Sequence, residues 1–279
     1  MRSILRGMPL ALAFASALWL TAVPAAADDL ETCANASADK AVAACTRAID
    51  SGRYGGRDLV ALLTNRCAEW SDEQGDKAIA DCSRAIQLDP TDADAFSNRA
   101  HVYYTRRQYD RTIEDLNEAV RLHPNDADLL SNRGLAYNNM GQYDHAIEDL
   151  SQAIRLNQDL ADAFYNRGIA YRHKQHLDRA IADYSEAIRL NPKYAGAFNN
   201  RGLSYALTGQ FDRAIEDLNE AIRLDPNLAG AFYNRGLSWE RKHDLQRALA
   251  DFKKFAELAP SHPDGPRAVE RVTKALSGR

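Results

Sequence analysis

The sequence lacks an excess of positive charge. Its 279 residues include 35 Lys or Arg and 39 Asp or Glu, so the formal net charge at pH 7 is -4. Domains that bind nucleic acid usually carry a basic surface, and this composition predicts no nucleic-acid partner. Charged residues make up 27% of the chain and hydrophobic residues 45%, which is typical of a soluble globular protein.

The short motifs of common catalytic sites are also missing. The sequence has no phosphate-binding loop, no nucleophile elbow and no zinc-binding motif. His173 and His176 lack a carboxylate or third ligand at a convincing spacing, so we interpret them as surface histidines. The segment 52–57, GRYGGR, could hold a phosphate, but a flexible connector is the favoured interpretation. We therefore expect no enzyme activity, no cofactor and no metal.

Cysteine is scarce, and no pair has the Cys-x-x-Cys spacing of redox and metal sites. Four cysteines allow three pairings. We favour structural disulfides over a metal site or redox chemistry, because an exported chain can keep them. The four are Cys33, Cys45, Cys67 and Cys82.

Only the N-terminus has a long stretch without charge. Residues 1–27 combine Arg2 and Arg6, an apolar run and three alanines at 25–27, which are the parts of a secretory signal. We expect cleavage after Ala27 and no stable membrane insertion afterwards. An uncleaved anchor is the alternative, because the run is long enough to span a bilayer. Without a lipobox or a twin-arginine pair, ordinary export to a periplasm, or to the cell exterior, is predicted.

The sequence does contain a repeat. Asn-Arg recurs at steps of 33, 34, 34, 34 and 34 residues. A second helical segment follows each copy, and most of these segments end at a proline, which stops a helix. Each unit is thus a helical hairpin, and a fixed step in this range marks an array. The asparagines are Asn65, Asn98, Asn132, Asn166, Asn200 and Asn234.

These units resemble the tetratricopeptide repeat family, in the Asn-Arg-Gly form common among bacterial members. The unit 161–194 fills the family's pattern of large, small, aromatic, Ala, apolar, Ala and Pro places with Phe164, Gly168, Tyr171, Ala180, Tyr184, Ala187 and Pro192. The resemblance implies an all-α fold, a right-handed solenoid in which neighbouring hairpins bury one another's apolar faces. We number the places of each unit from 1 to 34, with Ala161 at place 1.

The repeat register divides the chain into four parts: a signal at 1–27, a truncated unit and linker at 28–59, six units at 60–262 and a capping helix at 263–279. The units are 60–92, 93–126, 127–160, 161–194, 195–228 and 229–262. Cys67 falls at the small place 8 and Cys82 at the large place 24 of one hairpin. We predict that these two pair and, by analogy, that Cys33 pairs with Cys45.

An arginine at place 7 lies beside the apolar stripe of each first helix, where its neighbours are mostly small. A buried guanidinium needs an anion, and every arginine has an aspartate 15 or 16 residues later. Pairing within each unit leaves no arginine or aspartate without a partner at the ends of the array. We therefore predict six ion pairs, each between the two helices of one hairpin. Exposed, weak pairs are the alternative. The pairs are Arg66 with Asp81, Arg99 with Asp115, Arg133 with Asp149, Arg167 with Asp183, Arg201 with Asp217, and Arg235 with Asp251.

The opposite side of each first helix lines the concave groove in the family. The asparagine row at place 6 can donate to and accept from a peptide backbone, or it can instead order neighbouring helices. Apolar residues at places 5 and 9 would form a binding strip on the groove wall or pack against the next unit. These residues are Leu135, Tyr165, Ile169, Leu203, Tyr233 and Leu237. The groove places lack the lysines of a carboxylate clamp, so recognition of an acidic C-terminus is not expected.

The leading hypothesis is an exported, non-catalytic module that binds an extended peptide or a partner protein in its groove. The alternative is a structural assembler, which would form a homo-oligomer or an envelope complex through its ends or its convex face. An enzyme ranks third.

Overall fold

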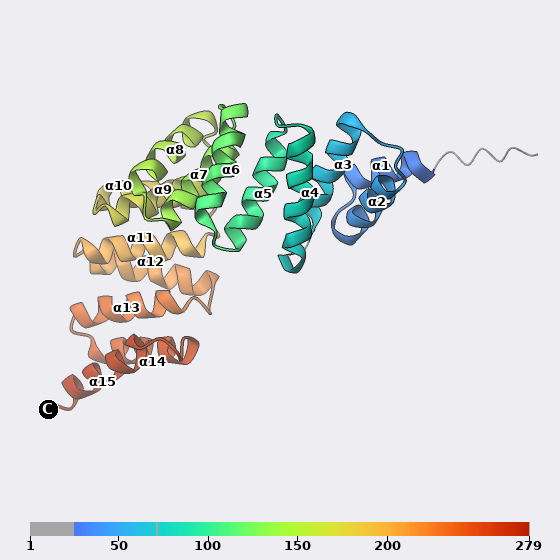
Figure 1. Ribbon diagram of the computed structural model, residues 1–279. Helices are drawn as coiled ribbons and strands as arrows, with labels where there is room; N and C mark the ends of the chain where they lie inside the picture. Colours follow the sequence, from blue (N-terminus) through green and yellow to red (C-terminus); the bar gives the residue numbers. More distant parts are fainter. Residues whose placement is uncertain (1–24, 71, 279) are drawn as a thin grey trace, which may run out of the picture.

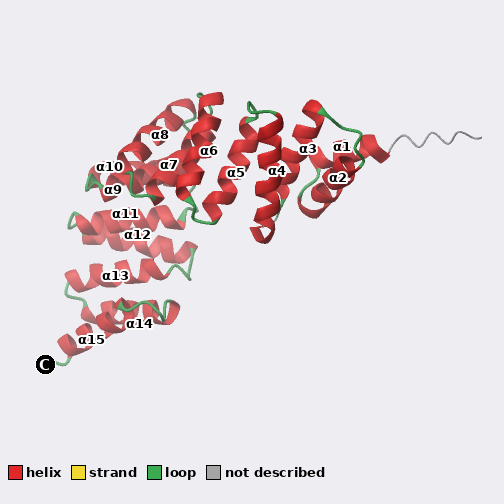
Figure 2. Cartoon of the chain, viewed as in Figure 1, coloured by secondary structure: helices red, strands yellow, loops and turns green. Residues whose placement is uncertain are grey.

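The chain folds into a solenoid of helices. The computed structural model describes residues 25–70 and 72–278, and within these residues it contains fifteen α-helices, one short 3-10 helix and no strand (Figure 2). The all-α solenoid predicted from the repeats is confirmed. The helices are α1 (Ala25–Asn35), α2 (Ala38–Asp50), α3 (Gly56–Glu69), α4 (Gly75–Leu88), α5 (Ala93–Thr105), α6 (Tyr109–Leu122), α7 (Ala127–Asn139), α8 (Tyr143–Leu156), α9 (Ala161–His173), α10 (Leu177–Leu190), α11 (Ala195–Leu207), α12 (Phe211–Leu224), α13 (Ala229–Arg241), α14 (Leu245–Leu258) and α15 (Asp264–Leu276).

Successive helices pack as antiparallel neighbours, and the stacked hairpins curve into an arc from α1 to α15 (Figure 1). Each of the six units supplies one hairpin, from α3 with α4 to α13 with α14, and α1 with α2 forms the truncated unit. The predicted signal, 1–27, lies outside the described residues except for its last three, which begin α1. Within the described residues, no helix has the length and apolar character needed to cross a membrane.

The turn inside the hairpin has the same backbone conformation in units 2 to 6. At place 15, Gly141 and Gly209 have φ angles of 72° and 78°, in the left-handed region that glycine adopts without strain. Arg107, Gln175 and His243 take φ angles of 58° to 62° at the same place. Because these five turns are the same, the two helices of each of these hairpins keep the same register. Repeat places can therefore be compared across units 2 to 6.

Small residues at place 8 let the two helices of a hairpin approach each other. A Cβ atom added to Gly168 would lie 2.7 Å from Cε1 of Tyr184, and one added to Gly134 would lie 2.6 Å from Cγ of Leu150. Tyr184 and Leu150 are completely buried at place 24. In units 3 to 6, the core is therefore a large side chain that packs directly against the backbone of the facing helix.

The N-terminal end of the array differs from the boundary expected from the repeat register. Helix α3 begins at Gly56, four residues before the unit predicted from Val60, so it takes up the last two residues of the expected connector. Asp58 in its first turn favours this earlier start, since a carboxylate stabilises a helix N-terminus. At the other end, Ala268 and Val272 of α15 are buried against α14. Helix α15 therefore packs against the last hairpin of the array.

Candidate functional site

Each place-7 arginine forms a bidentate salt bridge with the aspartate of its own hairpin. In all six pairs, Nε and Nη2 donate to the two carboxylate oxygens at 2.6 to 2.9 Å. The arginine side chains are 14 to 21% exposed and the aspartates 7 to 11%. These are the pairs predicted from the 15- and 16-residue spacing, and they lie largely out of water.

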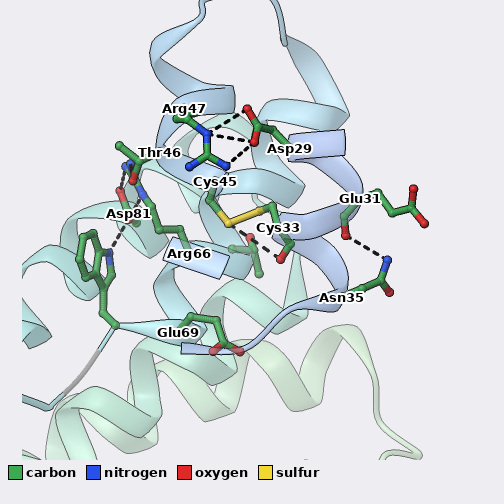
Figure 3. The surroundings of a disulfide bond; sticks show 12 residues. Asp29, Glu31, Cys33, Asn35, Cys45, Thr46, Arg47, Arg66, Glu69 and Asp81 are labelled. Carbon is green, nitrogen blue, oxygen red and sulfur yellow. Dashed lines mark hydrogen bonds and ion pairs between the residues drawn. A yellow bond between two sulfur atoms is a disulfide. The ribbon is translucent and has the colours of Figure 1, made fainter. Parts of the chain in front are cut away.

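The same arginines also reach back to the preceding hairpin, which the sequence reasoning missed. The remaining nitrogen, Nη1, donates to a side-chain oxygen on the second helix of that hairpin at 2.7 to 3.1 Å. Figure 3 shows Arg66 between Asp81 and Thr46. The sequence did contain a signal for this contact, because place 25 is Ser, Thr or Asn in every case. The acceptors are Thr46, Ser83, Asn117, Ser151, Ser185 and Asn219.

Burial and charge act in opposite directions on these pairs. Burial raises the pKa of Asp183 above its usual value, and the hydrogen bonds and charge of Arg167 only partly offset this rise. Burial alone would lower the pKa of Arg167, but the hydrogen bonds and charge of Asp183 outweigh it and raise the pKa. The guanidinium also lies 5.7 Å from the ring of Phe164 and 5.8 Å from that of Tyr171. The arginine row therefore belongs to the scaffold that fixes the unit-to-unit geometry.

The cysteines lie in the two N-terminal hairpins. The sulfur atoms of Cys33 and Cys45 are 2.09 Å apart, and those of Cys67 and Cys82 are 2.01 Å apart (Figure 3 shows the first pair). All four side chains are buried. Each pair lies between the two helices of one hairpin. Places 8 and 24 predict the Cys67–Cys82 pair, and analogy predicts the Cys33–Cys45 pair.

The asparagine row does not present one uniform surface. Asn132 is exposed and Asn65 and Asn98 are half-buried, whereas Asn166 is only 7% exposed. The expectation that all six face an open groove is therefore wrong for Asn166. At this point α7 approaches α9 closely, and Nδ2 of Asn138 donates to the Asn166 carbonyl at 2.8 Å.

In the C-terminal units the asparagines bond to neighbouring helices. Nδ2 of Asn200 donates to the Tyr165 hydroxyl at 3.1 Å, and Nδ2 of Asn234 donates to Oδ1 of Asn199 at 3.0 Å. For these two residues the alternative role, ordering adjacent helices, describes the contacts. The row is most accessible at Asn132, in the N-terminal half of the array.

The residues of the predicted apolar strip also differ from one another in their contacts. Tyr165 packs on Tyr194 with ring centroids 4.7 Å apart, and Tyr233 packs on Phe255 at 4.8 Å. Burial raises the pKa of the Tyr165 hydroxyl. Both tyrosines fill space inside the solenoid. The place-9 residues are half-buried, as the two tyrosines are, but three of them line cavities. The place-9 residues are Leu135, Ile169, Leu203 and Leu237, and those that line the cavities are Leu135, Leu203 and Leu237.

Two adjoining cavities occupy the N-terminal half of the groove. The larger has a volume of about 390 Å³ and lies between α5, α6 and α7, and the smaller has about 110 Å³ and lies between α3, α4 and α5. They share Asn98 and His101 as lining residues. A third cavity of about 300 Å³ lies between α11 and α13, beside Leu203, Leu237 and Asn234. Within the described residues, no cluster of His, Cys, Asp or Glu could hold a metal ion.

Comparison with known proteins places these features in context. Tetratricopeptide repeat profiles match residues 102–164, 161–194 and 195–228. No curated protein matches the chain in sequence. A crystal structure of MamA is 30% identical, with a TM-score of 0.53, over 58% of this chain and 95% of that chain.

Two further crystal structures have lower identity and show the shared fold alone. YrrB, described as "a TPR protein with an unusual peptide-binding site", is 24% identical with a TM-score of 0.57, over 68% of this chain and 96% of its own. PilW, a "widely conserved type IV pilus biogenesis factor", is 18% identical with a TM-score of 0.67, over 77% of this chain and 98% of its own.

Proposed function

Because the chain belongs to the tetratricopeptide repeat family, whose members are protein-interaction modules, we propose that it binds an extended segment of a partner protein in its concave groove. The observation that carries this proposal is the pair of adjoining cavities that share Asn98 and His101. Together they extend from α3 to α7, which gives an extended peptide a continuous concave surface with apolar walls and convergent polar groups.

The polar groups suit a peptide backbone. An exposed carboxamide both donates and accepts hydrogen bonds, and Asn132 is exposed at the edge of the larger cavity. Asn98 lines both cavities one unit earlier, and its Nδ2 also donates to the Thr64 carbonyl of α3 at 3.4 Å. In the C-terminal half, Asn200 and Asn234 already donate to neighbouring helices. The proposed site is therefore the N-terminal half of the groove and not its whole length.

The test compares two arginine substitutions of exposed asparagines. Asn132→Arg places a long side chain at the proposed site, whereas Asn227→Arg lies in the turn between α12 and α13, away from it. Crosslinking in an envelope extract, followed by mass spectrometry, would identify proteins captured by the wild-type chain. We expect Asn132→Arg to weaken binding of a captured partner by about tenfold or more, and Asn227→Arg to leave it unchanged. Equal capture by both variants would contradict groove binding.

The structural assembler predicts a different result. Assembly through the ends or the convex face would leave capture by Asn132→Arg intact and would give a multimer in light scattering. The outer surface of α15 exposes Pro266, Arg267 and Glu270, and a polar outer face is typical of a capping element that ends a repeat array. This surface favours groove binding over stacking at the C-terminal end.

We also propose that the protein is exported, most simply to a periplasm, and that its four cysteines are oxidised there. The proposal rests on the sequence of residues 1–27 and on the two cysteine pairs. The secreted protein should begin at Asp28 in N-terminal sequencing. Ala27→Arg should block cleavage, because the site requires a small residue. A secreted wild-type chain that retains Met1 would contradict the assignment.

A further inference from the structure

The larger cavity of the groove lies beside a small side chain at place 5. It lies over Leu116 at place 24 of unit 2, beside Ser97 at place 5 and Asn132 of the next unit. The equivalent residues two units later are Tyr184, Tyr165 and Asn200, each 68 residues further along the chain. The two sites can be compared directly, since the hairpin turns have the same conformation.

In the later site, the chain fills this space with its own phenol ring. The Tyr165 ring lies 5.9 Å from the Tyr184 ring between centroids, and its hydroxyl accepts a hydrogen bond from Nδ2 of Asn200 at 3.1 Å. Unit 6 repeats the first contact, because Tyr233 at place 5 lies 5.7 Å from the Phe252 ring at place 24. A fifth-place tyrosine therefore covers the place-24 side chain twice in this array.

Unit 2 has counterparts of the two residues that contact Tyr165 in the later site, but it has no tyrosine at place 5. Ser97 replaces the tyrosine, and Leu116 is 2% exposed at the base of the cavity. Asn132, the counterpart of the asparagine that donates to the Tyr165 hydroxyl, is exposed. The cavity volume of about 390 Å³ is sufficient for an aromatic side chain.

We propose that this cavity receives a tyrosine side chain of the partner, with the ring over Leu116 and the hydroxyl accepting a hydrogen bond from Asn132. The proposal rests on the groove function proposed above and names the residue that the groove selects. One difference between the two sites bears on the charge of the ligand. Asp128, which is exposed, stands where the later site has Gly196, and a Cβ atom added to Gly196 would lie 3.2 Å from the Tyr165 hydroxyl. A carboxylate at this position repels a negatively charged ligand, so phosphotyrosine is excluded.

Single amino-acid derivatives test the cavity without a known partner. Methyl resonances of Leu116 and Leu135 should shift in saturable NMR titrations with N-acetyl-tyrosinamide, and N-acetyl-leucinamide should bind about tenfold more weakly. N-acetyl-phosphotyrosinamide should not bind. Equal binding of the leucine derivative, or no saturable shift with the tyrosine derivative, would overturn the proposal.

Two reciprocal variants supply the matched controls. Ser97→Tyr fills the cavity as Tyr165 fills its counterpart, so it should abolish the titration while the protein still melts cooperatively. Tyr165→Ser should open a second cavity and add a second set of shifts near Leu203. Asn132→Ala should reduce the preference for the tyrosine over the phenylalanine derivative by about fivefold. An unchanged titration in Ser97→Tyr would place the ligand elsewhere and overturn the assignment.

A random-peptide display selection separates this proposal from the groove function. We expect peptides enriched on the wild-type protein to share an aromatic residue, mainly tyrosine, and to bind Ser97→Tyr at least about tenfold more weakly. Enriched peptides that lack an aromatic residue and compete with one another for the groove would overturn the tyrosine assignment and leave groove binding standing. A monomer–dimer equilibrium that Ser97→Tyr abolishes would identify a second copy as the occupant and also overturn it.

Discussion

Replacing Arg167 by methionine should lower the free energy of unfolding by about 3 kcal/mol, because it leaves the buried carboxylate of Asp183 without its partner. Methionine keeps much of the apolar stem but supplies none of the three hydrogen bonds that Arg167 makes to Asp183 and Ser151. Denaturant unfolding of the wild type and the variant measures the difference.

The pH dependence of this loss has a definite sign. In the variant, burial raises the folded-state pKa of Asp183 with no arginine to oppose it. A carboxyl group with a raised folded pKa binds more protons in the folded state than in the unfolded state, so stability falls as pH rises through that range. The deficit relative to wild type should therefore be larger near pH 7 than near pH 4.

Two controls separate burial of the pair from loss of an arginine. Arg189 forms an exposed pair with Glu186, with side chains 62% and 45% exposed, and Arg189→Met should change stability by less than about 0.5 kcal/mol. Adding Asp183→Leu to Arg167→Met should restore much of the loss, since an apolar pair can replace a buried ion pair. A loss in Arg167→Met no larger than in Arg189→Met would contradict the buried-pair interpretation.

Removing the Cys67–Cys82 pair by substituting both residues with alanine should cost about 3 kcal/mol, by the chain-entropy estimate for a loop of this size. The pair joins α3 to α4, where the hairpin connection contains a 3-10 turn instead of the regular turn of later units. Hydrogen exchange should show the loss of protection concentrated in α3 and α4.

The C-terminal units provide the internal control for this experiment. A repeat array contacts only its nearest neighbours, so a lesion at one end should leave distant units largely intact. Protection in α12 and α14 should be unchanged by the double alanine substitution and by reduction with a thiol. Uniform loss of protection along the chain would show that the array unfolds as one unit and that the pair does not act locally.

The repeat made most of the fold predictable from the sequence. A constant step of 34 residues fixes which side chains share a place, so the hairpins, the small residue at Gly168 and the register of the arginine pairs followed without a structure. The same register predicts which cysteines lie close together, with Cys33 and Cys45 assigned by analogy. The hydrogen bond from each arginine to the preceding hairpin was not predicted, because it joins different units. The recurring Ser, Thr or Asn at place 25 was a sequence signal for it.

The sequence by itself determined the hairpins of this protein, because the helix packing and the arginine–aspartate pairs lie within one hairpin and recur at the same places. Only the tertiary structure decided which groove positions are accessible. Asn132 and Asn166 occupy the same place, yet one is exposed and the other is 7% exposed. Their difference, like the cavity beside Ser97, depends on the size of side chains contributed by adjacent units. Such space is a property of three-dimensional packing between helices, and a place in a repeat does not specify it.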